Sequence, residues 1–524
     1  MDYREVNLKP DERAALLLRG IYERYGYRKY KMSRFEEYSL YAENKDFLGS
    51  DKVITFTDLD GRLMALKPDV TLSIIKNTRA TKESGEKLYY IENVFRESKE
   101  SHTYKEISQL GLEMLGEVGI SGVTEVAELA VSSLEAVSGD YILEISHMDF
   151  VLELLNGLGV SENVKYKLIR HIRNKNADGV RKTGEKEGID REKLKAVCLL
   201  PSLYGEAEST IKKASKLVIN ETMQNALDEL SGIYAALKAS GKSSNVHVDF
   251  SIVNDIDYYN GIIFKGYIND LARSVLAGGQ YDKAMRKFGK DIGAAGFALY
   301  LNEIGMLEEE VDKPEGEGFM TIALPKGRLG DEVYGILAQA GYDCPGFYEE
   351  NRKLIFENEE KKIRYLLVKP SDVAIYVEHH AADAGVVGKD ILLETSPDVY
   401  ELMDLKIGRC RMAVAAPSGY AEDMNRLLRV ATKYPNIARD HYAEMNRETE
   451  IIKLNGSLEL APIIGLSDVV VDIVETGNTL RENNMVILEE FRQISARFIA
   501  NKSSFKFRNK TIGNMLKKLE GALK

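Results

Sequence analysis

The sequence predicts an α+β domain with a largely antiparallel sheet, followed by an α/β domain built in two lobes. Strand-like runs flank a long helical stretch in residues 1–306, whereas short apolar strands alternate with helical segments in residues 319–524. Residues 307–318, LEEEVDKPEGEG, are acidic, contain Pro and Gly, and lack apolar periodicity, so they are predicted to form a linker. A chain of 524 residues is also too long for one ordinary domain.

In the first domain, residues 11–25 have apolar side chains at helical spacing. Residues 148–240 are predicted to be mainly helical, with charged faces at the surface. Strands are predicted at residues 87–95, 140–146, 245–253 and 261–267. Strands, a helical insertion and further strands together predict the α+β domain.

In the second domain, the predicted strands are short apolar runs, as buried strands usually are. They lie at residues 319–324, 364–368, 384–387, 411–415 and 469–474. Their alternation with helical or glycine-bounded segments predicts an α/β domain with a cleft between two lobes.

The composition excludes several classes of protein. The net charge of −11 argues against a broad nucleic-acid surface, although a local cluster of cations can still bind a nucleotide. No signal peptide and no apolar run of about 20 residues is visible, so we expect a cytoplasmic protein without a membrane span. Cys198, Cys344 and Cys410 form no C-x-x-C pair, and no H-E-x-x-H occurs, so we expect no metal site made by the protein itself.

The most informative motif is VVVDIVETGNTLREN, which begins at residue 469. A buried strand ends at the carboxylates Asp472 and Glu475, and a tight turn then opens a helix. Gly477 permits a positive φ, and the N–H groups of such a turn can cradle a phosphate. The carboxylates could hold ribose hydroxyls directly or through Mg²⁺. The turn comprises Thr476, Gly477, Asn478 and Thr479. By itself it could equally be an ordinary capped strand-to-helix turn.

This motif resembles the phosphoribosyl-pyrophosphate loop of ATP phosphoribosyltransferases, and the resemblance extends through nearly all of residues 319–524. Further blocks follow in the family's order: ALPKGRL at 323–329, RKLIF at 352–356, residues 383–390, ATKYP at 431–435 and LNGSLELAP at 454–462. The resemblance implies a two-lobed fold like periplasmic binding proteins, with the active site between the lobes. It also assigns Glu459 to the phosphoribosyl pyrophosphate site.

The resemblance implies the reaction as well. Adenine N1 of ATP attacks C1 of the phosphoribosyl group, and pyrophosphate leaves through an oxocarbenium-like transition state. Cations that meet the leaving group stabilise this transition state, together with Mg²⁺ that we expect the substrate to carry. The candidate cations are Lys326, Arg328, Arg352, Lys353 and Lys369. The alternative is that they are ordinary surface charges.

Two residues depart from the family's pattern. Lys369 stands where many relatives have Arg, which keeps the charge but loses the bidentate geometry. His380 replaces a usual Gly, so a backbone that needed a positive φ there is expected to differ locally.

Residues 1–305 resemble histidyl-tRNA synthetases, and more closely the regulatory paralogue on which short ATP phosphoribosyltransferases depend. The resemblance is carried by FTDLDGRLMALKPDVTL at 56–72, VFR at 94–96, QLGLE at 109–113 and GGQYD at 278–282. It implies a histidine site, since carboxylates can take the ammonium and an imidazole N–H while tyrosines give hydroxyls and aromatic walls. The matching residues are Asp69, Thr71, Gln109, Glu113, Tyr258 and Tyr259. They could also persist merely as scaffold.

The residues of the synthetase reaction are altered. Asn254 replaces the histidine-specific catalytic Arg, Glu303 replaces the Arg that holds the ATP phosphate, and Thr103 stands where another Arg is expected. A carboxylate at the place of Glu303 would repel a triphosphate. We therefore expect a fused enzyme whose second domain joins ATP to phosphoribosyl pyrophosphate and whose first domain senses histidine as an inhibitor. Separate-chain relatives form mixed octamers, so a fused homotetramer follows by analogy.

Two alternatives remain. The chain could be an inactive protein that only binds histidine, or an active synthetase that transfers histidine to tRNA. The intact turn at 476–479 weighs against the first alternative, and Asn254 and Glu303 weigh against the second.

Overall fold

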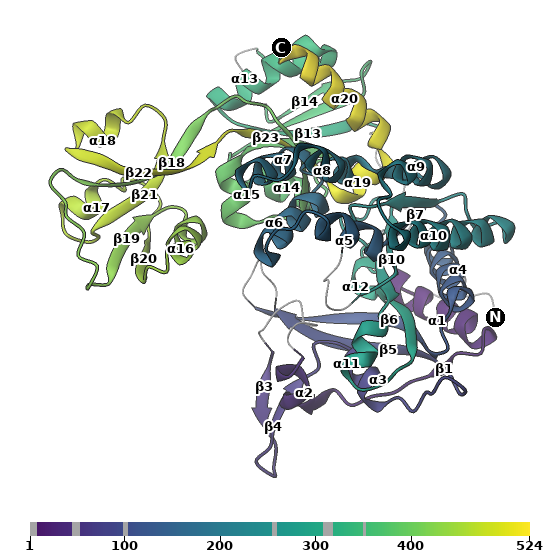
Figure 1. Cartoon of the computed structure of the whole chain (residues 1–524). Coiled ribbons are helices and arrows are strands. Elements are labelled where there is room, and N and C mark those ends of the chain that lie inside the picture. The colour runs from purple at the N-terminus through teal and green to yellow at the C-terminus, as the bar shows by residue number, and fades with distance from the viewer. Residues whose placement is uncertain are drawn as a thin grey trace. The chain divides into compact units, whose positions relative to one another are not determined.

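The computed structural model describes residues 8–44, 53–97, 103–253, 259–307, 318–348 and 353–523. The chain divides into two compact units, Met1–Pro314 and Glu315–Lys524, which are described separately (Figure 1). The division falls within the linker predicted for residues 307–318, of which 308–317 lie outside the described residues. In the described ranges, no helix is both long and apolar enough to cross a membrane.

The first unit is built on a nine-stranded sheet whose neighbouring strands are mostly antiparallel. The pairs β1–β5 and β7–β9 are parallel. In spatial order the strands are β1 (Arg28–Lys29), β5 (Glu86–Glu97), β6 (Tyr104–Gly116), β12 (Gly293–Tyr300), β11 (Leu276–Gln280), β10 (Ile262–Ile268), β7 (Tyr141–His147), β9 (Val246–Asp249) and β8 (Tyr204–Glu206). A small sheet contains β2 (Phe35–Glu37), β4 (Leu63–Leu66) and β3 (Thr55–Thr57). The prediction of a largely antiparallel α+β domain is confirmed.

Helices cover this sheet, and the predicted helical insertion is present apart from the short strand β8. The long helix α4 buries Val126, Leu129 and Val131 in the main core of the unit. The helices are α1 (Pro10–Arg24), α2 (Tyr38–Ala42), α3 (Thr71–Asn77), α4 (Ile120–Val137), α5 (Met148–Asn156), α6 (Glu162–Arg173), α7 (Ala177–Lys186), α8 (Arg191–Val197), α9 (Ala207–Ala214), α10 (Glu221–Ala239), α11 (Asp282–Lys287) and α12 (Leu301–Ile304).

One predicted strand is shorter than the sequence suggests. The run at 245–253 is apolar enough for a longer strand, but β9 ends at Asp249. The Asp249 carboxylate accepts a hydrogen bond from the Ser251 N–H at 2.8 Å, which turns the chain. The buried Lys175 ammonium donates to both oxygens of this carboxylate at 3.0 and 2.8 Å and fixes the turn.

The second unit contains two sheets, and each forms one lobe (Figure 1). The first lobe has the strands β14 (Ile355–Asn358), β15 (Ile363–Val368), β13 (Met320–Pro325), β16 (Ala384–Gly388), β23 (Ala496–Asn501) and β17 (Val399–Asp404) in this order. The second lobe has the strands β20 (Thr449–Lys453), β19 (Leu428–Thr432), β21 (Val469–Val474), β18 (Cys410–Pro417) and β22 (Met485–Ile494). All five strands predicted for this domain are therefore present, and the chain crosses between the lobes twice, at residues 405–409 and at Ser495.

Parallel strands form the centre of the first lobe, where β13 pairs with β15 and β16. In the second lobe, β19 pairs in parallel with β20 and β21. The helices are α13 (Arg328–Leu337), α14 (Val373–Glu378), α15 (Lys389–Thr395), α19 (Lys502–Phe507) and α20 (Asn509–Ala522) in the first lobe, and α16 (Pro435–Glu444), α17 (Leu460–Ile463) and α18 (Asn478–Glu482) in the second. The prediction of a two-lobed α/β domain is confirmed.

Candidate functional site

The predicted phosphate turn lies at the end of β21 in the second lobe. Gly477 has φ +73°, a conformation that favours glycine, and α18 begins at the next residue. The Asn478 N–H donates to the Thr476 hydroxyl oxygen at 3.4 Å. The side chains of Thr476, Asn478 and Thr479 are exposed. The local backbone is therefore the strand, glycine turn and helix that the motif predicts.

Near this turn, the charge of one predicted carboxylate, Glu459, affects the pKa of another, Asp472. Burial is the main cause that raises the pKa of Asp472 to about 6, and the negative charges of Glu459 and Asp390 raise it further. The Ile473 N–H and the Lys433 ammonium oppose this rise. Asp472 is consequently a carboxylate short of positive charge, and a cation or hydrogen-bond donors would complete its surroundings.

Cations gather at one edge of the sheet in the first lobe. Lys326 directly follows β13, its N–H donates to the Val368 carbonyl at 2.8 Å, and Lys369 follows that residue. Lys353 reaches the same edge, because the neighbouring Leu354 carbonyl accepts a bond from the N–H of Leu367 at 2.8 Å. All three lysine side chains are exposed. The fourth predicted cation, Arg352, lies outside the described residues.

Arg328 joins the two predicted halves of this site. It is the first residue of α13, after Gly327 with φ +97°. Its guanidinium donates to both oxygens of Glu475 at 2.7 and 2.9 Å, which raises the pKa of Arg328. The Glu475 carbonyl accepts a further bond from Arg411 at 3.1 Å. The structure thus joins Arg328 of the first lobe to Glu475, the residue directly before the predicted phosphate turn of the second lobe.

In the first unit, the predicted histidine site centres on Glu113, which is 2% exposed. Its carboxylate accepts hydrogen bonds from the hydroxyls of Thr71 at 2.9 Å and Tyr281 at 2.6 Å. Burial raises the pKa of Glu113 to about 8, despite these two donors, and the charge of Asp69 adds to the rise. A Cβ on Gly296 would lie 1.8 Å from one oxygen of Glu113, so only glycine leaves room there.

Two further predicted residues of this site, Asp69 and Tyr259, lie near Glu113. The Asp69 carboxylate accepts from the Leu72 N–H at 2.9 Å and from the Arg96 guanidinium at 3.3 Å. Gln109 is buried on β6, and the charge of Asp69 contributes to the raised pKa of Tyr259. Burial, first of all, raises the pKa of Tyr259 well above its ordinary value. Tyr258 lies outside the described residues.

Sequence reasoning did not assign Arg96, Tyr281 or Gly296 to this cluster. Arg96 and Tyr281 stand in the quoted motifs VFR and GGQYD, and a residue-by-residue search of those motifs for polar side chains could have found them. The contact between Arg328 and Glu475 was also missed. Those residues are 147 positions apart, and no local pattern links them.

Most of the residues that depart from the patterns of the two families lie in the described part of the chain. His380 has φ +62°, so the histidine itself adopts the left-handed conformation, and the local change of backbone expected there is wrong. Its imidazole Nε2 lies 3.8 Å from the Asp383 carboxylate. Glu303 is half-buried on α12, Thr103 is exposed, and Asn254 lies outside the described residues.

A metal ion bound by the protein itself would need several His, Cys, Asp or Glu side chains close together. Among the residues that the structure describes, no group of three or more His, Cys, Asp or Glu side chains is arranged to hold a metal ion.

The fold and these clusters define a fused protein: an aminoacyl-tRNA synthetase-like sheet domain, followed by a two-lobed domain in which Arg328 of one lobe pairs with Glu475 beside the glycine turn of the other. Sequence profiles of known families match both parts, histidyl-tRNA synthetase at residues 2–304 and ATP phosphoribosyltransferase at residues 369–521. The ATP phosphoribosyltransferase of Brachyspira hyodysenteriae is 58% identical over 205 residues, which cover 39% of this chain and 100% of that protein. The enzyme of the same name from Bacillus velezensis is 50% identical over 201 residues, 38% of this chain and 93% of that protein. The chain belongs to the ATP phosphoribosyltransferase family and carries a histidyl-tRNA synthetase family domain before it.

A solved structure agrees with this assignment of the fold. It is described as an ATP phosphoribosyltransferase regulatory subunit/histidyl-tRNA synthetase from Bacillus halodurans. The TM-score is 0.51 at 22% sequence identity, and the match covers 69% of this chain and 94% of that chain.

Proposed function

We propose that this chain transfers the phosphoribosyl group of phosphoribosyl pyrophosphate to N1 of ATP, the first step of histidine biosynthesis, under feedback control by histidine. The observation that carries the proposal is the contact of Arg328 with Glu475. It sets a cationic edge of one lobe against the phosphate turn of the other, as a substrate with a phosphate at one end and a diphosphate at the other requires.

The phosphate turn is proposed to seat the 5-phosphate. The N–H groups around Gly477 and the exposed hydroxyls of Thr476 and Thr479 provide donors for its oxygens. The carboxylates Asp472, Glu475 and Glu459 then face the ribose. Ionised carboxylates accept hydrogen bonds from ribose hydroxyls.

The departing pyrophosphate is proposed to lie on the first lobe. Charge builds on this group as the bond to C1 breaks, so Lys326, Arg328 and Lys369 stabilise the transition state more than the bound substrate. Lys353 and Arg352 are assigned to the same task. Adenine N1 is unprotonated at neutral pH and needs no general base.

Mg²⁺ is proposed to arrive with phosphoribosyl pyrophosphate, where it would neutralise the diphosphate and polarise the leaving oxygen. The surroundings of Asp472 fit a nearby dication. Its pKa is raised to about 6 by burial and by neighbouring carboxylates, so positive charge at this place is favourable.

The pairing of Arg328 with Glu475 implies an exchange of partners when substrate binds. Both side chains are exposed, at 77% and 53%, so the pair is solvated and contributes little to folding. In the complex, ribose hydroxyls would take Glu475 and the diphosphate would take Arg328. A ligand that offers only one of these groups leaves the other charge unpaired, which favours the complete substrate.

The first unit is proposed to bind histidine as an inhibitor. The carboxylates of Glu113 and Asp69 would take the cationic groups of the ligand, with Thr71, Gln109 and Tyr259 as further ligand-binding residues. The family resemblance assigns Tyr258 to the same task. Inhibition requires that histidine favour a less active arrangement, with a coupling of about 1–3 kcal/mol. We also propose a homotetramer, and a likeness of the two-lobed unit to periplasmic binding proteins, as the family resemblance implies.

The test is turnover of ATP, phosphoribosyl pyrophosphate and Mg²⁺, followed by the ultraviolet absorbance of the ribosylated adenine. We compare Gly477→Val with Gly419→Val, a matched control in the second lobe whose φ is +85° and whose added Cβ meets nothing within 4 Å. Both changes strain a left-handed glycine, but only Gly477→Val should abolish turnover. An inactive wild-type chain, or equal losses in both variants, would contradict the proposal.

A further inference from the structure

The helix α15 of the first lobe is bonded to the second lobe through two carboxylates. The Glu394 carboxylate accepts the N–H groups of Asn436 at 3.2 and 3.0 Å and of Ile437 at 3.1 Å. The Asn436 side chain donates to the Glu394 carbonyl at 2.9 Å. Glu394 therefore caps the first turn of α16 from the opposite lobe, which satisfies N–H groups that a helix leaves unpaired.

The second contact is buried. The Tyr434 hydroxyl donates to the Asp390 carboxylate at 3.1 Å, and the two residues are 5% and 9% exposed. A Cβ on Gly388 would lie 2.2 Å from the same carboxylate group, so glycine before α15 leaves Asp390 its place. Burial, above all, raises the pKa of Asp390, and the Tyr434 hydroxyl and the charge of Lys433 oppose this.

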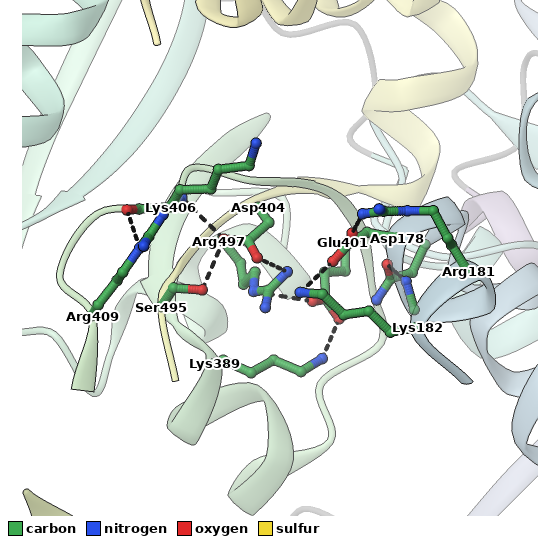
Figure 2. A network of polar contacts seen from close by, with 12 residues as sticks. Asp178, Arg181, Lys182, Lys389, Glu401, Asp404, Lys406, Arg409, Ser495 and Arg497 are labelled. Atoms are coloured by element: carbon green, nitrogen blue, oxygen red, sulfur yellow. Dashed lines mark hydrogen bonds and ion pairs between the residues drawn. The ribbon is translucent and has the colours of Figure 1, made fainter. Parts of the chain in front are cut away.

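The helix α15 also contacts residues in and next to the segments that connect the two lobes (Figure 2). The Lys389 N–H donates to the Ser495 carbonyl at 3.0 Å, and its ammonium donates to Glu401 at 2.5 Å. Arg497 lies 3.5 Å from Glu401 and 3.1 Å from Asp404. The Ser495 hydroxyl donates to Asp404 at 2.7 Å. One short helix thus bonds both to the crossover and to the second lobe.

These contacts lead from α15 towards Asp472, the carboxylate that is proposed to face the ribose. Asp390 and Lys433 are both electrostatic neighbours of Asp472, and Lys433 precedes Tyr434. The phosphate turn belongs entirely to the second lobe, whereas Lys326, Arg328 and Lys369 belong to the first. The orientation of the lobes therefore decides whether cations meet the leaving group, while the turn itself is complete within one lobe.

We propose that Glu394 and Asp390 are positioning residues for phosphoribosyl transfer, which hold the second lobe at the orientation in which the cations of the first lobe reach the leaving pyrophosphate. The inference rests on the proposed function of this site. It assigns no contact with substrate to either residue.

The test compares Glu394→Ala and Tyr434→Phe with two matched controls in the full-length chain. Asp440→Asn removes a charge from an exposed position on α16, and Tyr376→Phe removes an exposed tyrosine hydroxyl. In both test variants kcat should fall on the order of tenfold, since a displacement of about 1 Å can cost that or more. The KM for phosphoribosyl pyrophosphate should stay within about twofold, because its phosphate turn is intact.

Hydrogen exchange gives a readout that does not depend on catalysis. In Glu394→Ala, the amides at the start of α16 should exchange about tenfold faster, as expected for loss of a helix cap, and Asp440→Asn should leave them unchanged. Unchanged exchange in Glu394→Ala overturns the inference but not the proposed function. The same holds for an active wild-type enzyme whose test variants behave like the controls. A proportional change of KM and kcat also overturns it, and a wild-type chain without turnover overturns the proposed function with it.

Discussion

Replacing Glu113 by Gln should make the first unit more stable at neutral pH. The Glu113 carboxyl has a pKa of about 8 in the folded chain, compared with an ordinary value of 4.5. Below pH 4.5 it is protonated in both the folded and the unfolded chain. As the pH rises from there through about 8, the unfolded chain loses the proton first, so the contribution of this group to stability declines over that window.

The magnitude follows from the shift of the pKa. At about 1.4 kcal/mol for each pH unit above the ordinary pKa, keeping this carboxyl protonated at pH 7 costs about 3 kcal/mol. Gln mimics the protonated carboxyl. The hydroxyls of Thr71 and Tyr281 bond to different oxygens of Glu113, so the Gln oxygen keeps one of them as a donor and the NH2 group replaces the other oxygen. We expect the stability advantage of Glu113→Gln to grow by about 2.5 kcal/mol between pH 5 and pH 7, measured by urea unfolding.

A matched control separates this effect from a general effect of charge. Glu106→Gln removes a carboxylate from an exposed position on the same strand, β6. It should show no comparable dependence on pH. A difference between Glu113→Gln and wild type that stays constant from pH 5 to pH 8 would refute the reasoning, because it would mean that Glu113 titrates normally in the folded chain.

Three further predictions concern the two sites. Glu475→Gln frees Arg328, so the Kd of inorganic pyrophosphate, measured by calorimetry, should fall several-fold; equal or weaker binding would contradict the exchange of partners. Gly296→Ala sets a methyl group against Glu113 and should lower stability by about 2 kcal/mol and weaken histidine binding, and unchanged thermal unfolding would refute the crowding. Asp472 is protonated below a pKa of about 6 and ionised above it, so kcat/KM for phosphoribosyl pyrophosphate should rise from pH 5 to pH 7. The variant Asp472→Asn should lose this rise, and a wild-type profile that is flat over the same range would contradict it.

The regular elements could be predicted from the sequence because their signals are local. The apolar run at 469–474 and the glycine after it determine β21, the turn and the start of α18 without help from the rest of the chain. The end of β9 could not be predicted in this way. The turn between Asp249 and Ser251 that ends it is fixed by Lys175, which is 74 positions from Asp249 and becomes its partner only in the folded unit.

The contacts within the sites follow the same division. The motifs pointed to the carboxylates and cations, but not to the residues with which they pair in the fold. Arg96 lies 27 positions from Asp69, and Arg328 lies 147 positions from Glu475. The partners of such an ion pair follow no periodic pattern and no fixed spacing in the sequence, so the pair can be identified only after the fold is known.

Each of the two proposed sites contains one carboxylate with a raised pKa. Burial and a neighbouring carboxylate raise the pKa of Glu113 to about 8 and that of Asp472 to about 6. In each case the missing positive charge is the charge that the proposed ligand supplies, the cationic groups of histidine in one site and Mg²⁺ with the substrate in the other. Binding should therefore lower both pKa values and release protons. Calorimetry of histidine binding in buffers of different ionisation enthalpy should show this release near pH 7, where Glu113 is still protonated, and it should be absent in Glu113→Gln.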